Sequence, residues 1–210
     1  KARKIYEELL KTNPENLVIL QNYAILLSQT KEFKKSEDIF KKCLKIKPKD
    51  SLLLYNYGKL FHDQKIFDKA TRFYKESFSL DNKNYLAIYN IGNILLSENK
   101  FDQAIEFFKK AIEINPSNSR AYNNMGIAQK RIGNFNKALE FYKEAIKRDK
   151  NYVDAHVNYA TMLLTTNRLK EGFEEYEWRK KSKSFSDYID YRSLNLNSKI
   201  WNGETIKNKK

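Results

Sequence analysis

The sequence predicts an all-α protein built from tandem helix–turn–helix repeats. In residues 85–118, two amphipathic segments carry apolar residues at helical spacing, and a short polar stretch separates them. Pro116 ends the second segment. Gly92, a small residue inside the first segment, returns as Gly58 and Gly126, 34 residues before and after, and the surrounding pattern moves with it. Short amphipathic helices that carry small residues can pack closely as antiparallel pairs.

The first residues match only the second half of such a repeat. Ala2 takes the place of the small residue, Tyr6 that of an aromatic residue and Pro14 that of the terminating proline. We therefore expect residues 1–16 to form a half repeat that contains a second helix only. A chain that starts in this way is expected to be a piece of a longer protein.

Five full repeats are expected next, without insertions, over residues 17–50, 51–84, 85–118, 119–152 and 153–184. Their first helices should begin at Leu17, Ser51, Tyr85, Ser119 and Val153, and their second helices at Phe33, Phe67, Phe101, Phe135 and Leu169. The eighth position is always small: Ala24, Gly58, Gly92, Gly126 and Ala160. Glycine inside a helix costs about 1 kcal/mol relative to alanine, so its recurrence indicates close contact between helices.

The second helices repeat a small residue followed by an aromatic one. The small residues are Ser36, Ala70, Ala104, Ala138 and Gly172, and the aromatic residues four positions later are Phe40, Tyr74, Phe108, Tyr142 and Tyr176. Beyond the last repeat the helical period fades, while apolar residues such as Trp201 persist. Because the end of a repeat array needs a cover for its apolar face, residues 185–210 are expected to be a C-terminal cap or linker that depends on Trp178 and Trp201.

The period and the positions of the small and aromatic residues resemble the tetratricopeptide repeat (TPR) family. The resemblance implies a right-handed superhelix of tandem TPR units, with the first helices lining a concave groove and the second helices forming the outer wall. It also implies a role in binding other proteins.

An asparagine recurs at the sixth position of every full repeat: Asn22, Asn56, Asn90, Asn124 and Asn158. Asparagine is a mediocre helix former, so its recurrence calls for a reason. In the related repeats of O-linked N-acetylglucosamine transferase, this position forms an asparagine ladder that grips extended polypeptide, which implies side chains that point into the groove rather than between helices. The alternative is that asparagine is simply common at this position and in this composition. Tyr55, Tyr89 and Asn93 complete the predicted peptide-binding set.

Catalytic and metal-binding signatures are absent from the sequence. No phosphate-binding loop, nucleophile elbow or metal-binding helix motif is present, so we expect no enzyme activity, metal or cofactor. His156 replaces a core residue, and His62 with Asp63 is interpreted as a surface polar pair. The single cysteine, Cys43, lies at a position of small residues and is expected to be buried. No apolar run approaches the 18 or more residues of a membrane span.

The net charge of +14 raises the question of nucleic-acid binding. Most of the lysines, however, belong to the second helices, which the resemblance places on the outer wall. A nucleic-acid channel would instead place basic residues and stacking aromatic residues along the first helices. The sequence therefore favours a polypeptide partner, with nucleic acid as a less favoured alternative.

The function predicted from the sequence is non-catalytic recognition of an extended polypeptide in the concave groove, in a cytoplasmic protein. An alternative comes from residues 171–179 and Trp201, which resemble the junction between a TPR array and a bacterial glycosyltransferase-like domain. The chain would then be the substrate-presenting segment of a larger glycosyltransferase whose catalytic domain lies outside it. Self-association through the end repeats is a third possibility.

Overall fold

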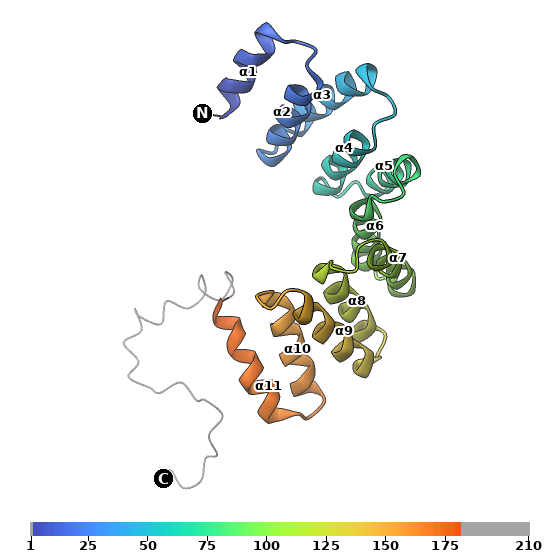
Figure 1. The fold of residues 1–210 in the computed structure, drawn as a ribbon, viewed down its shortest axis with the longest axis vertical. Helices are drawn as coiled ribbons and strands as arrows, with labels where there is room; N and C mark the ends of the chain where they lie inside the picture. Colours follow the sequence, from blue (N-terminus) through green and yellow to red (C-terminus); the bar gives the residue numbers. More distant parts are fainter. Residues whose placement is uncertain (1, 182–210) are drawn as a thin grey trace, which may run out of the picture. The chain divides into compact units, whose positions relative to one another are not determined.

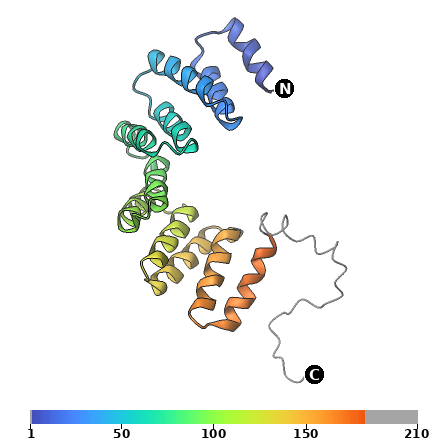
Figure 2. The ribbon, with the colours of Figure 1, turned by 180° about the vertical axis from the view of Figure 1, so that it is seen from behind.

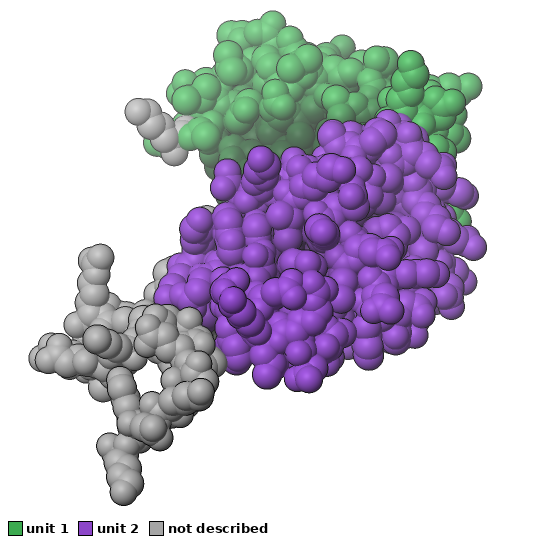
Figure 3. Space-filling view, turned by 60° about the horizontal axis from the view of Figure 1, so that its bottom comes forward, with its two compact units in different colours: residues 1–98 green, residues 99–210 purple. Residues whose placement is uncertain are grey.

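The structure, a computed structural model, describes residues 2–181, and in this part of the chain all regular secondary structure is helical. Two compact units divide the chain, unit 1 at residues 1–98 and unit 2 at residues 99–210 (Figure 3). Unit 1 contains α1 (Ala2–Thr12), α2 (Leu17–Gln29), α3 (Phe33–Ile46), α4 (Ser51–Asp63), α5 (Phe67–Leu80) and α6 (Tyr85–Ser97). Unit 2 contains α7 (Phe101–Ile114), α8 (Ser119–Arg131), α9 (Phe135–Arg148), α10 (Val153–Thr165), α11 (Leu169–Tyr176) and the 3-10 helix η1 (Glu177–Lys181).

Within each unit, helices that follow one another in the chain pack side by side (Figures 1 and 2). In unit 1, α2 pairs with α3 and α4 with α5; in unit 2, α8 pairs with α9 and α10 with α11. The first helices of consecutive repeats also contact each other within a unit: α2 contacts α4, and α8 contacts α10. The prediction of tandem all-α helix pairs is therefore confirmed, and every full-length helix begins at the residue that the pattern indicated.

Side-chain oxygens cap four of the first helices, α2, α4, α6 and α8. The oxygen Oδ1 of Asn16 accepts hydrogen bonds from the backbone N–H groups of Val18 and Ile19, and the Asp50 carboxylate accepts one from Leu53 at 2.9 Å. Asn84 and Asn118 cap α6 and α8 in the same way. These residues all occupy the last position of a repeat, so the start of each of these helices is specified by the preceding repeat.

Close packing between paired helices explains the recurrent glycine. A Cβ atom added to Gly126 would lie 2.6 Å from Cε1 of Tyr142, and one added to Gly58 would lie 2.9 Å from Cδ1 of Tyr74. Both tyrosines are fully buried. Ala24, Ala70 and the other small residues at these positions are buried as well, as the sequence predicted. Cys43 is buried too, and burial raises the pKa of its thiol to about 11.

Side chains from α10, α11 and η1 pack together where the described residues of unit 2 end. Trp178 stacks on the imidazole of His156, with the ring centroids 3.7 Å apart. Glu175 bonds to Nδ1 of that imidazole, and the carbonyl oxygen of Lys150 bonds to Nε2 at 3.0 Å. His156 is thus the packed histidine that its position predicted. Trp201 and the expected cap at residues 185–210 lie outside the described residues.

The turn inside each repeat contains one residue in the left-handed region, always at the fifteenth position. Lys31, Lys65, Asn99 and Asn167 have φ between 60° and 63°, and Gly133 has φ of 83°. Only glycine takes this conformation without steric cost. The sequence pattern did not reveal this requirement, because lysine, asparagine and glycine alternate at the position.

Lys65→Gly should therefore stabilise the protein, because it removes a Cβ atom from a left-handed residue. Relief of about 1–2 kcal/mol of steric cost is partly offset by about 0.4–1 kcal/mol of added freedom in the unfolded chain. The reciprocal change, Gly133→Lys, has open space for its Cβ atom and should be destabilising through the backbone alone. Urea denaturation of both variants checks this; equal shifts in the same direction would contradict it.

Candidate peptide-binding surface

One face of each first helix carries the predicted peptide-binding residues. Helical spacing places residues 2, 6, 9 and 13 of a repeat on the same face. In unit 1 this face consists of Val18, Asn22, Ile25 and Gln29 on α2; Leu52, Asn56, Lys59 and Asp63 on α4; and Leu86, Asn90, Asn93 and Ser97 on α6. We call these residues the unit 1 first-helix face. Its asparagines form a row between an aliphatic row (Val18, Leu52 and Leu86) and the more varied residues beyond.

Asn90 is not directed only at solvent. Its Nδ2 donates a hydrogen bond to the hydroxyl oxygen of Tyr55 at 3.2 Å, and its Oδ1 accepts one from Asn93 at 3.4 Å. Tyr55 is half-buried against Tyr74, with ring centroids 5.7 Å apart, and burial raises the pKa of Tyr55. Two predicted site residues, Tyr55 and Asn90, are thus joined across consecutive first helices. Tyr89 is half-buried next to Asn90 on α6.

Unit 2 repeats this connection with different chemistry. Nδ2 of Asn158 donates to Oδ1 of Asn123 at 2.9 Å, and Nδ2 of Asn123 donates to Oδ1 of Asn124 at 3.1 Å. Asn123 is only 3% exposed and occupies the repeat position of Tyr55. Sequence reasoning missed Asn123, although the Asn-Asn pair at this position was a visible signal.

The expectation that the asparagines point into the groove rather than between helices is therefore wrong for Asn90 and Asn158. Each donates to the fifth-position residue of the preceding repeat, so each helps to hold consecutive first helices together. Asn22, which is exposed, and Asn56, which is half-buried, make no such bond within residues 2–181. Their amides remain available to a ligand.

A pocket of about 240 Å³ lies in the unit 1 first-helix face, between α2 and α4. Its apolar lining comes from Ile25, Leu60 and the Phe40 ring of α3. The polar lining consists of Ser28, Gln29, Tyr55, Asn56, Lys59 and Asp63. Lys59 and Asp63 form an ion pair at 3.2 Å and neutralise each other. Two of the predicted site residues, Tyr55 and Asn56, thus line a pocket whose volume suits a single side chain.

The pocket also contains a buried hydroxyl without a partner. Oγ of Ser28 makes no hydrogen bond. A helical serine usually bonds the carbonyl four residues earlier, but the carbonyl of Ala24 already accepts a bond from Ser36 at 2.7 Å.

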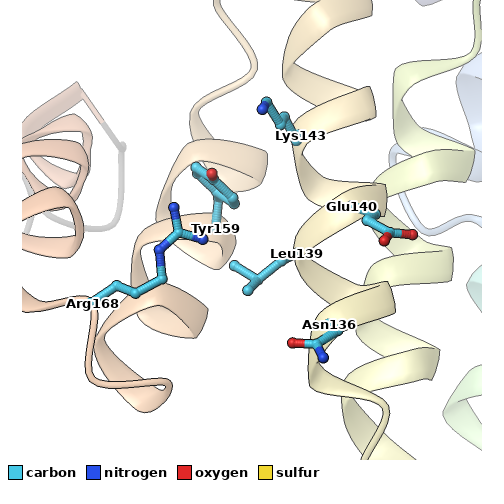
Figure 4. Close-up of a pocket in the computed structure, with 6 residues that line it drawn as sticks. All are labelled: Asn136, Leu139, Glu140, Lys143, Tyr159 and Arg168. Carbon is cyan, nitrogen blue, oxygen red and sulfur yellow. The ribbon is translucent and has the colours of Figure 1, made fainter.

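Two pockets in unit 2 are lined by none of the predicted site residues. One of about 380 Å³ is lined by Leu139 and Tyr159 together with Asn136, Glu140, Lys143 and Arg168. Figure 4 shows Arg168 reaching toward Tyr159 and Leu139. Because Arg168 is paired with Glu171 at 2.6 Å, this hollow lacks an uncommitted guanidinium.

His62 is not the surface polar pair that its neighbour Asp63 suggested. Its ring is half-buried, and its Nδ1 lies 3.2 Å from the hydroxyl oxygen of Tyr74. Burial lowers the pKa of His62 and raises that of Tyr74. The Tyr74 hydroxyl therefore stays protonated and shares a hydrogen bond with the imidazole, while Asp63 pairs with Lys59 instead.

The Tyr55–Asn90 hydrogen bond should be measurable as a coupling. Asn90→Ala and Tyr55→Phe should each destabilise unit 1, and the double variant should lose less than the sum, by about 0.5–1.5 kcal/mol. Asn22→Ala, on an exposed residue, is the control and should change stability by under about 0.5 kcal/mol. Urea denaturation gives all four values. Strict additivity would show that the bond contributes nothing.

His62 should make the protein less stable in mild acid. Its pKa in the folded protein lies below its ordinary value of 6.5, so below about pH 6.5 the unfolded chain binds a proton that the native protein does not. Stability from this group is present above that pH and is lost as pH falls. His62→Gln should therefore show a shallower loss of urea midpoint between pH 7.5 and 5.5, and parallel profiles would contradict the assignment.

Within residues 2–181, no cluster of three or more potential metal ligands is found. The same residues contain no helix that is long and apolar enough to cross a membrane.

Comparison with known families decides the repeat type. Residues 85–118 and 119–152 each match one tetratricopeptide repeat model, and residues 18–50 match another. Tandem TPR helix pairs therefore build the all-α fold of the described residues. None of the curated proteins compared with it matches.

Solved structures of other TPR proteins share this fold. MamA from Desulfovibrio magneticus RS-1 is 17% identical with a TM-score of 0.67, over 83% of this chain and 97% of that one. YrrB, described as a TPR protein with an unusual peptide-binding site, is 16% identical with a TM-score of 0.63, over 91% and 98%. PilF from Pseudomonas aeruginosa is 17% identical with a TM-score of 0.70, over 85% and 81%. These comparisons lend no support to the glycosyltransferase resemblance of residues 171–179.

Proposed function

We propose that this TPR protein is a non-catalytic scaffold that binds an extended segment of another protein along its first-helix faces. The observation that carries the proposal is the pair Asn22 and Asn56, whose amides make no hydrogen bond to other repeats among residues 2–181. A side-chain amide offers a donor and an acceptor, as a peptide unit does. Amides on consecutive first helices can therefore hold the backbone of a ligand and tolerate many sequences.

The spacing of the helices suits an extended ligand. Packed helices lie about 8–10 Å apart, and an extended chain advances about 3.3–3.6 Å per residue. One asparagine would therefore meet about every third peptide group. YrrB, which shares this fold, has a peptide-binding site, and this supports a peptide-binding role here.

Charge distribution favours a protein ligand over nucleic acid. Some basic residues of the second helices are paired within the chain, as Lys41 is with Glu37 at 2.8 Å. Lys59, on the first-helix face, is neutralised by Asp63. A strand of nucleic acid needs a continuous basic groove with stacking aromatic residues, and unit 1 does not present one among its described residues.

The test is selection of dodecapeptides displayed on phage against the whole chain, followed by fluorescence polarisation with the selected peptides. Asn22→Ala with Asn56→Ala should weaken binding by about 1–3 kcal/mol, or from several-fold to about a hundredfold, while the urea midpoint stays unchanged. The matched control is Lys109→Ala with Lys143→Ala on the exposed sides of α7 and α9. Failure to select any peptide, or equal affinity for both double variants, would overturn the proposal.

A further inference from the structure

The unit 1 first-helix face contains more exposed aliphatic surface than a backbone-binding role requires. Val18 is 65% exposed, Leu52 60% and Leu86 39%, all at the second position of consecutive repeats. In unit 2 the same position holds Arg120 and Asp154. The aliphatic row is therefore particular to unit 1 and is not a requirement of the repeat.

The pocket lies on the other side of the asparagine row. Along each first helix the order is aliphatic residue, asparagine, then the residues that line the pocket, such as Ile25 on α2 and Lys59 on α4. Its 240 Å³ equals about eight waters at about 30 Å³ each. That volume suits one aromatic or branched aliphatic side chain, and the apolar lining from Ile25, Phe40 and Leu60 suits its chemistry.

The charge on this face argues against a charged anchor. Lys59 and Asp63, both in the pocket wall, satisfy each other. A ligand carboxylate or ammonium would have to break that pair and give up its own hydration, which is costly without a new partner. Burial of an apolar side chain carries no such cost.

We propose that unit 1 recognises a protein segment with the pattern aliphatic–aromatic–aliphatic. The central side chain fills the pocket between α2 and α4, and its two neighbours rest on the aliphatic row of Val18, Leu52 and Leu86. The pattern follows from strand geometry: successive side chains of an extended chain point to opposite sides. With the ligand backbone along Asn22 and Asn56, one side faces the pocket and the other the aliphatic row. This inference rests on the proposed peptide-binding function and adds to it a class of ligand sequence.

The probes are fluorescein-labelled peptides with polar, uncharged flanks and a centre of Leu-Phe-Leu, Leu-Ala-Leu or Ser-Phe-Ser. Fluorescence polarisation with the whole chain should give the tightest binding for Leu-Phe-Leu. Loss of the central ring should cost at least tenfold in Kd, and loss of both flanking leucines should cost several-fold. Equal binding of Leu-Phe-Leu and Leu-Ala-Leu would overturn the inference.

Variants test the pocket contact and the aliphatic-row contact separately. For each variant we compare the ratio of the Kd values of two peptides, because this ratio does not change when part of the protein is unfolded. Ser28→Leu fills the pocket from its wall, and Gln29→Trp covers it from an exposed position at the end of α2, so the second stays informative if the first fails to fold. Either should abolish the preference for Phe over Ala. Leu52→Ser should abolish the preference for flanking leucines, whereas Leu80→Ser, at an exposed leucine on the second helix α5, should leave both preferences unchanged.

The outcomes separate this inference from the function on which it rests. One outcome is that the phage-selected peptides bind through Asn22 and Asn56 with affinities that do not change in Gln29→Trp or Leu52→Ser. That result would support the scaffold function and overturn the aliphatic–aromatic–aliphatic pattern. If no peptide binds at all, both fall. Light scattering of the free protein tests whether a second copy of the chain covers the aliphatic row instead. A molecular mass that rises with protein concentration in wild type, and not in Leu52→Ser, would assign the aliphatic row to self-association and overturn the inference.

Discussion

The close contact between a small residue of one helix and a buried tyrosine of its partner is the constraint on which the rest of each unit depends. Gly58 faces Tyr74 and Gly126 faces Tyr142 at distances that leave no room for a Cβ atom. Because the buried side of each first helix is assigned to this contact, its opposite side is left for solvent and ligands. The same geometry brings the hydroxyl of Tyr74 within hydrogen-bonding distance of Nδ1 of His62.

The asparagines at the sixth position occupy one repeat position but differ in their hydrogen bonds. Asn90 and Asn158 donate to residues of the preceding repeat, Tyr55 and Asn123, and so link first helices that are not adjacent in sequence. Asn22 and Asn56 make no such link. Within residues 2–181, the recurrent asparagine therefore makes different contacts in different repeats of the same array.

The two units differ in what they present to a partner, although they share one repeat. Unit 1 combines an aliphatic row, the side-chain amides of Asn22 and Asn56, and a pocket in whose wall Lys59 and Asp63 form an ion pair. Unit 2 replaces the aliphatic residues with Arg120 and Asp154 and ties its amides into the chain from Asn158 through Asn123 to Asn124. Since Arg120 and Asp154 are exposed, these two replacements change the surface chemistry with little effect on the packing that maintains the repeat.

The sequence alone determined the helix pairs, their first residues and the small residues between them, because these follow from spacing along a single chain and from the volume available between two packed helices. It also indicated which face of each first helix carries the asparagines. Only the tertiary structure decided which of them are already bonded, because Tyr55 and Asn90 lie 35 residues apart and meet through packing. The pocket, its unpartnered Ser28 hydroxyl and the left-handed turn at Lys31 and Lys65 were likewise decided there, since each depends on backbone and side-chain positions that residue identity does not specify.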